Sequence, residues 1–282
     1  MEELGRRSSW WWWLVVVAGL AVVVLVVLQP WADHPTEPAA TDVPAAASDI
    51  PVGPSPSLTR TGPSAAGSTP APVPGEDAVF DAATLPTLFV TPQDLAVSVP
   101  AAKGGVRAGV GPGTVAWGLP AGASIDPATC TTAVTVVARP PDEFDARSSL
   151  NDAFTWQQRV AVLADADAAR DAFRDLVTTV DACPAYAQTK PDAPQVAWAA
   201  EPAIEGQGVY PSIVQELTRS EGTTRLPSFH GHMLVGNTIV TWTATALAEG
   251  TDTEAALATL GDATTLNAMV QGRARLAVEA LG

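Results

Sequence analysis

Residues 156–183 limit the fold more than any other part of this 282-residue chain. From 156 to 163 the apolar side chains share one face and Arg159 lies on the other, which predicts a half-buried β-strand. Asp165 is a suitable helix N-cap, and the apolar residues after it follow the i, i+3, i+4 spacing of an amphipathic helix. Pro184 prevents the helix from continuing. The domain must therefore provide a sheet for this strand and a core for this helix.

The chain after this unit is predicted to form strands and then two helices. The last two strands are separated only by Gly236-Asn237, which indicates a hairpin. The spacing of Thr251 and Glu254 matches a capping box for a short helix, and a final amphipathic helix is expected at 263–281, with Leu281 among its inward residues. The strand-like runs are 195–199, 210–218, 229–235 and 238–247. The fold class is therefore α+β, an antiparallel β-sheet flanked by helices.

The segment before this unit is less regular. The sequence Thr91-Pro-Gln-Asp94 predicts a capped helix start. Residues 101–123 contain seven glycines and are expected to form a flexible loop, with a short strand possible at 115–117. This loop lacks the Gly-Lys-Ser/Thr ending of a phosphate-binding loop. Residues 131–138 are rich in β-branched side chains and suit either a strand or a helix.

Residues 10–28 form a run of 19 residues without charge or proline. A helix of this length is about 28 Å long, which matches a hydrocarbon core of roughly 30 Å. Arg6 and Arg7 precede the run and favour a cytoplasmic N-terminus, so we expect a cytoplasmic tail at 1–9 and a single membrane-spanning helix. A cleaved signal peptide is the alternative, but the run is long and no small-x-small cleavage site follows it. Arg6-Arg7 also partly matches a twin-arginine signal.

The composition changes twice after the apolar run. Residues 29–75 contain 11 prolines and little apolar content, which predicts a disordered, semi-extended linker that lifts the next domain off the membrane. Residues 76–282 are expected to form the extracytoplasmic domain. They carry 24 acidic and 12 basic residues, a balance that argues against nucleic acid as a partner.

Cys130 and Cys183 are the two cysteines of the chain. Both follow the predicted membrane segment, and an even count in an oxidising compartment favours a disulfide between them. Two free thiols, one of them reactive, are the alternative.

Several short pieces, in this order and spacing, resemble the PknH-like extracellular domain of mycobacterial receptor serine/threonine kinases. They are residues 88–95, 126–130, 159–163 with 166–170 and Cys183, and 238–246 with the closing helix. The resemblance implies an antiparallel sheet with flanking helices, a cleft for an unidentified ligand, and a disulfide matching Cys130–Cys183. This chain lacks the cysteines of the family's second disulfide, and it has no kinase domain.

The sequence offers few residues for chemistry. His230 and His232 lie on one face of a predicted strand, close enough to share a metal, but no third ligand accompanies them, so we expect packing histidines and no metal or cofactor. Trp117, Trp198 and Tyr210 are candidates, with the two histidines, for lining a ligand pocket. No catalytic constellation is apparent, and the acidic face of the helix after Asp165 is expected to be a solvated surface.

We therefore expect a non-enzymatic, single-pass membrane protein whose outer domain binds a ligand or a protein partner at the cell envelope, as a sensor-like domain does. An envelope hydrolase is one alternative, and a structural envelope protein acting through protein partners is another. A pocket with convergent polar groups would favour a ligand, whereas a flat apolar patch would favour a protein partner.

Overall fold

A computed structural model describes residues 73–191, 193–247 and 252–282. The predicted membrane segment at 10–28 and nearly all of the predicted linker lie outside these residues. Within the described ranges, no helix is both long enough and apolar enough to cross a bilayer. Val73, near the end of the predicted linker, packs against the larger of the two hydrophobic cores of the domain.

The described domain is built on an antiparallel sheet of ten strands, with the order β1-β3-β4-β10-β9-β8-β6-β5-β2 and with β7 paired to β8. Successive long strands are joined as hairpins, so the pairing follows local chain connections at β3–β4, β8–β9 and β9–β10. The strands are β1 (Arg107–Ala108), β2 (Ser124–Asp126), β3 (Glu143–Leu150), β4 (Phe154–Val162), β5 (Ala185–Thr189), β6 (Val196–Ala200), β7 (Ile204–Glu205), β8 (Ser212–Glu221), β9 (Thr224–Val235) and β10 (Thr238–Ala246).

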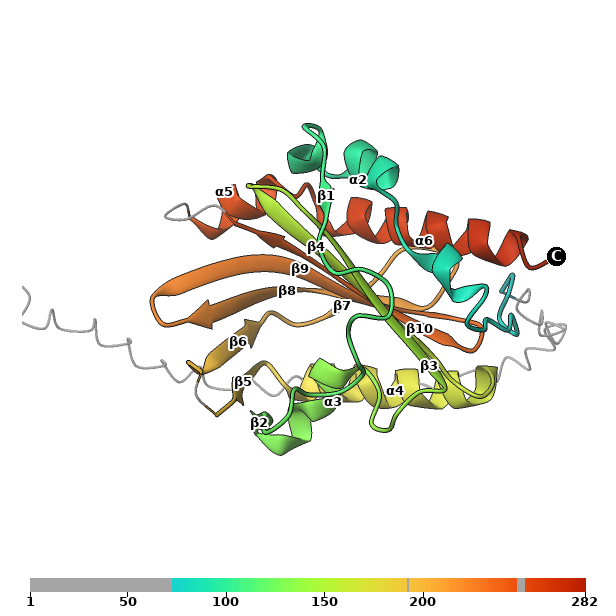
Figure 1. The fold of residues 1–282 in the computed structure, drawn as a ribbon, viewed down its shortest axis with the longest axis horizontal. Helices are drawn as coiled ribbons and strands as arrows, with labels where there is room; N and C mark the ends of the chain where they lie inside the picture. The colour runs from blue at the N-terminus through green and yellow to red at the C-terminus, as the bar shows by residue number, and fades with distance from the viewer. Residues whose placement is uncertain (1–72, 192, 248–251) are drawn as a thin grey trace, which may run out of the picture. The chain divides into compact units, whose positions relative to one another are not determined.

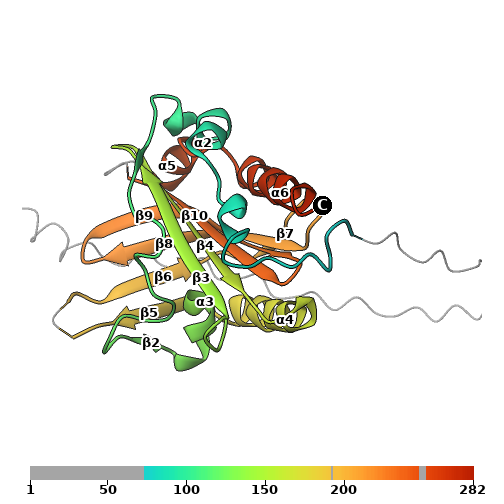
Figure 2. The same cartoon turned by 45° about the vertical axis from the view of Figure 1, so that its right-hand side comes forward.

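Helices cover both faces of this sheet (Figures 1 and 2). One face carries η1 (Leu85–Leu88), α2 (Pro92–Ser98), α5 (Thr253–Ala258) and α6 (Ala263–Glu279), and the other carries α3 (Thr131–Thr135) and α4 (Ala166–Ala182). Two short 3-10 helices, η2 (Pro100–Ala102) and η3 (Ala128–Cys130), follow α2 and precede α3. The predicted antiparallel sheet with flanking helices is confirmed.

The larger core lies between the sheet and α6. Every second residue of β4 and β10 points into it, as the period of two in a strand requires. Trp156 and Trp242 stack there with ring centroids 5.4 Å apart. The smaller core lies under α4, where Phe173 and Leu176 pack near Ile239. The strand and helix predicted from 156–183 therefore have the positions expected of them, and Asp165 caps α4 by accepting a hydrogen bond from the Ala168 amide.

Cys130 and Cys183 form the predicted disulfide, which joins η3 to the C-terminal end of α4. Thr91 and Asp94 form the predicted capping box of α2. The two-residue turn at Gly236-Asn237 joins β9 to β10 as predicted.

Several local expectations are wrong. Residues 115–117 form no strand, because they lie in a loop in which the Trp117 indole donates a hydrogen bond to the Thr135 carbonyl of α3. Asp252, and not Thr251, caps α5, since its side chain accepts from the Ala255 amide. Leu281 is 36% exposed because α6 ends two residues before it. The segment 131–138 was left open between strand and helix, and residues 131–135 form helix α3. Strands β3 and β5 were not predicted.

Candidate functional site

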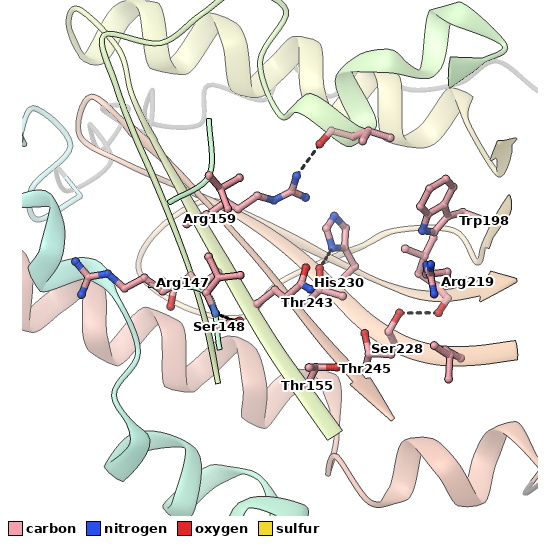
Figure 3. A pocket seen from close by; sticks show the side chains of 18 of the residues that line it. Arg147, Ser148, Thr155, Arg159, Trp198, Arg219, Ser228, His230, Thr243 and Thr245 are labelled. Atoms are coloured by element: carbon pink, nitrogen blue, oxygen red, sulfur yellow. Dashed lines mark hydrogen bonds between the residues drawn. The ribbon is translucent and has the colours of Figure 1, made fainter. Parts of the chain in front are cut away.

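Helices α3 and α4 cover only part of their face of the sheet, and the uncovered part forms a cleft of about 620 Å³. Its floor consists of residues from five neighbouring strands, β3, β4, β10, β9 and β8. Residues of α3, β5 and β6 line one side, and the loop after β1 lines another. Figure 3 shows the floor residues Thr243, Thr245, Ser228 and His230 side by side on adjacent strands.

The floor is polar because the strands alternate between the core and the cleft. In β10, Trp242 and Ala244 are fully buried in the larger core, so Thr243 and Thr245 must face the other way. His230 of β9 lies opposite Thr243 in the register, and its Nδ1 is 2.6 Å from the Thr243 hydroxyl. Strands β3, β4, β10 and β9 thus supply hydroxyl, imidazole and amide groups to one surface.

Arg159 of β4 carries a positive charge at this surface. Its Nη1 donates a hydrogen bond to the carbonyl of Val134 in α3 at 2.8 Å (Figure 3). No carboxylate within salt-bridge distance of Arg159 occurs among the residues that the structure describes. Burial lowers the pKa of its guanidinium, but a guanidinium remains protonated in proteins. The side chain is therefore a half-buried cation held in place by a backbone carbonyl.

Two aromatic rings form the side of the cleft next to Arg159. Tyr186 of β5 and Trp198 of β6 are register partners, and their rings stack with centroids 5.2 Å apart. Burial raises the pKa of the Tyr186 hydroxyl to about 12, although the charge of Arg159 opposes the shift. The hydroxyl is therefore a neutral donor, and the half-buried Trp198 offers a flat apolar surface.

The glycine-rich segment forms part of the rim. The Val110 amide donates to the Ser148 hydroxyl at 2.7 Å, and the Gly113 amide donates to Asp145 at 2.9 Å, so the segment is tied along β3. A Cβ at Gly109 would meet the ends of the Ser148 and Leu150 side chains, so a larger residue here would require both to shift. The loop expected to be flexible thus places the exposed side chains of Val110 and Val115 at the cleft.

His230 and His232 lie on one face of β9 as predicted, with ring centroids 4.5 Å apart. Each ring pairs through Nδ1 with a threonine of β10, His230 with Thr243 and His232 with Thr241 at 2.9 Å. Burial lowers the pKa of His230 to about 3 and lowers that of His232 well below its usual value. Within the described residues, no group of three or more His, Cys, Asp or Glu side chains is placed to hold a metal ion.

The five residues predicted to line a pocket are distributed over three places. Trp198 and His230 line the cleft. His232 is buried behind His230 and is 1% exposed, and Trp117 packs against the smaller core with its indole N–H donating to the Thr135 carbonyl. Tyr210 lies in the larger core, on the opposite face of the sheet.

Sequence reasoning did not select Arg159, Tyr186 or Thr243 for the site. Arg159 and Thr243 were assigned to the polar faces of their strands, and that assignment is confirmed. A charged residue in the middle of a strand that is buried on its other face was the available signal. Tyr186 gave no such signal, because β5 was not predicted.

Comparison with known proteins gives the fold. The extracellular domain of PknH from Mycobacterium tuberculosis superposes with a TM-score of 0.53 over 70% of this chain and 98% of that domain, at 14% sequence identity. An Rv0999 ortholog from Mycobacterium smegmatis aligns at 13% identity over 64% of this chain and all of that one, with a TM-score of 0.33. No family model and no curated protein matches the sequence. The superposition on the PknH extracellular domain shows that the described domain shares the fold of that domain.

Proposed function

We propose that this chain is a single-pass membrane protein whose extracytoplasmic domain binds a small ligand in the cleft between α3 and the strand floor, as a sensor-like module. The observation that carries the proposal is the cleft itself. It combines about 620 Å³ of space with polar groups from four strands, and such a volume suits a small molecule. The fold shared with a kinase extracellular domain supports a role in recognition.

The polar lining also bears on the two alternatives. A flat apolar patch would favour a protein partner, but the most exposed large apolar side chains come from separate segments. They are Val79 in the segment before η1, Val97 in α2 and Ile204 in β7. A hydrolase would need an activated nucleophile. Thr243 contacts His230, but a histidine whose pKa is about 3 is a poor base, and the described cleft lining includes no carboxylate to orient it.

Retention of a small molecule by the full chain in detergent tests the proposal. The protein is incubated with an envelope extract of the cell that makes it, washed, and the retained compounds are identified by mass spectrometry. Thr245→Trp fills the cleft from its floor, whereas Val97→Trp adds the same side chain to an exposed site on α2. We expect wild type and Val97→Trp to retain a compound that Thr245→Trp does not.

Equal retention by all three proteins, or by none, would contradict ligand binding in the cleft. The topology is tested separately by adding protease to cells whose outer layers have been removed and whose cytoplasmic membrane is intact. The domain after residue 76 should be digested from outside, and protection of the domain would contradict an extracytoplasmic location.

A further inference from the structure

We propose that the cleft selects an organic oxyanion, a carboxylate or phosphate carried by a ring, with the anionic group bound by Arg159 and the ring placed against Trp198. This inference rests on the proposed ligand-binding function and assigns a chemical class to the ligand. It comes from the charge of the lining, the free donors of Arg159 and the aromatic wall beside it.

The charge of the lining is opposite to that of the protein. The whole chain carries 30 acidic and 15 basic residues, yet the described lining of the cleft includes three arginines and no Asp or Glu. Two of these arginines are paired. Arg147 lies over the Phe89 ring and 3.1 Å from Asp145, and its side chain points away from the cleft in Figure 3, while Arg219 pairs with Glu221. Arg159 supplies the unbalanced charge.

The position of Arg159 suits anion binding. A guanidinium has five N–H donors, and the described structure gives Arg159 one side-chain hydrogen bond, from Nη1 to the Val134 carbonyl. That bond fixes the planar group while leaving donors for a carboxylate or phosphate, which can accept two parallel hydrogen bonds. A cation partly removed from water and lacking a carboxylate partner gains more from an anionic ligand than a surface arginine does.

The neighbours of Arg159 add donors without adding negative charge. The Tyr186 hydroxyl remains protonated at neutral pH, because burial raises its pKa to about 12. The imidazole of His230 remains neutral, because burial lowers its pKa to about 3. Neither group competes with a ligand for the guanidinium, and the Tyr186 hydroxyl is available as a second donor to an oxyanion.

The aromatic wall favours a ring in the body of the ligand. Trp198 is stacked on Tyr186 through one face, which fixes its orientation at low entropic cost. Its register partner in β8 is Arg219, and Leu217 lies two residues along the same strand and also lines the cleft. A planar ring or the apolar face of a sugar would therefore meet a preformed surface beside the anion site.

Matched pairs of probes test the proposal on the full chain in detergent, with affinities measured by ligand-observed NMR. Benzoate and phenyl phosphate are compared with benzamide, and glucuronate is compared with glucose, so that the pairs separate carboxylate from phosphate and aromatic ring from sugar. We expect at least one acid to bind about tenfold more tightly than its neutral partner, equivalent to about 1.4 kcal/mol.

Two variants with their controls assign this preference to residues. Arg159→Gln should bring the acid-to-neutral ratio to about one, while Arg159→Lys should keep part of it. Arg275→Gln removes a charge from an exposed position in α6, outside the cleft lining, and should leave the ratio unchanged. Trp198→Ala should weaken an acid and its neutral partner by the same factor. Unchanged melting temperatures of these variants exclude unfolding as the cause.

Equal binding of acids and neutral partners by wild type, an acid preference that survives in Arg159→Gln, or no binding of any probe would overturn the oxyanion proposal. The retention experiment distinguishes this failure from failure of the ligand-binding function. A neutral compound retained by wild type but not by Thr245→Trp would leave the function in place and remove the oxyanion.

Discussion

The histidine pair in β9 is separated by a glycine for a steric reason. His230 and His232 face the cleft side of the sheet, so the residue between them faces the larger core. There Gly231 is the register partner of Trp242, and a Cβ at this position would overlap the indole ring. The His-Gly-His spacing that was considered as a metal site therefore reflects the packing of Trp242 against the backbone of Gly231.

We expect Gly231→Ala to destabilise the domain by about 1–3 kcal/mol, because Trp242 is fully buried and has no free space to move into. Gly272→Ala is the control with the opposite sign. It lies in α6 with open space where its Cβ would be, so alanine should stabilise by about 0.5–1 kcal/mol. Urea denaturation of both variants measures the two effects, and a neutral Gly231→Ala would refute the steric explanation.

The same two histidines make stability depend on pH. Burial lowers the pKa of His230 from 6.5 to about 3 and lowers that of His232 as well, so below pH 6.5 the unfolded chain binds more protons than the folded one. The free energy of unfolding must then fall as the pH falls through this range, by about 1.4 kcal/mol per pH unit for each fully titrating histidine. Above about pH 8 both histidines are neutral in either state, and they no longer contribute to the pH dependence.

We expect the wild-type protein to lose about 2 kcal/mol of stability between pH 6 and pH 5 from the two histidines. His230→Gln should lose about half as much, since an amide cannot titrate. Urea midpoints of both proteins at pH 7, 6 and 5 provide the measurement. Identical pH dependence of the two proteins would show that His230 is protonated in the folded state as readily as in the unfolded one.

At the scale of elements, buried amide side chains attach irregular segments to the regular core. The side-chain Oε1 of Gln158 in β4 accepts a hydrogen bond from the backbone N–H of Val90 at 2.8 Å. Its Nε2 donates to the backbone carbonyl of Leu88 at 2.9 Å. Gln271 of α6 makes the corresponding pair of bonds to the backbone of Tyr210. Each side-chain amide takes the place of a neighbouring strand as hydrogen-bond partner. The Leu88 carbonyl and the Val90 N–H are therefore hydrogen-bonded although their segment does not join the sheet.

Asn237 performs this task at the turn between β9 and β10. Its Oδ1 accepts from the Phe80 amide at 2.8 Å, and its Nδ2 donates to the carbonyls of Phe80 and Leu163 at 3.1 and 3.0 Å. Asn237 is 2% exposed, so water cannot replace these bonds. The turn therefore connects the segment around Phe80, the end of β4 and the β9–β10 hairpin.

We expect Asn237→Ala to cost about 2–4 kcal/mol, because it leaves buried backbone groups of Phe80 and Leu163 without partners. Gln93→Ala on the exposed face of α2 is the matched control and should change stability by less than about 0.5 kcal/mol. Chemical denaturation provides both values. Hydrogen exchange at the Phe80 amide should also accelerate in Asn237→Ala, and an unchanged rate would contradict the bridging role.

At the scale of the molecule, the unequal covering of the two sheet faces creates the candidate site. One face is covered by α2, α5 and α6 over the larger core, and the other is covered by α3 and α4 at one end only. The disulfide holds η3, which leads directly into α3, against the end of α4. Arg159 then joins the floor to α3 through the Val134 carbonyl, so the same contacts that close one end of the face define the cleft beside it.

Local patterns were sufficient for the elements that carry their own signals. The strand and helix of 156–183, the capping box at Thr91, the β9–β10 hairpin and the disulfide were all predicted. Periodicity, caps and turn residues act over a few residues, and the chain has two cysteines in all, which offer one pairing. The polar faces of β4 and β10 were also predicted, since alternation follows from the period of the strand.

Only the tertiary structure decided which of those polar faces became a site. Strand order places Arg159, Thr243 and His230 on three adjacent strands and brings Trp198 of β6 to the wall of the same cleft. It places Tyr210 in the core on the other face. In the folded domain the glycine-rich loop lies at the rim of the cleft. The glycine of the His-Gly-His sequence lies against the ring of Trp242. Contacts between residues far apart in the chain depend on register and on where each helix ends, and neither is encoded in a short window of sequence.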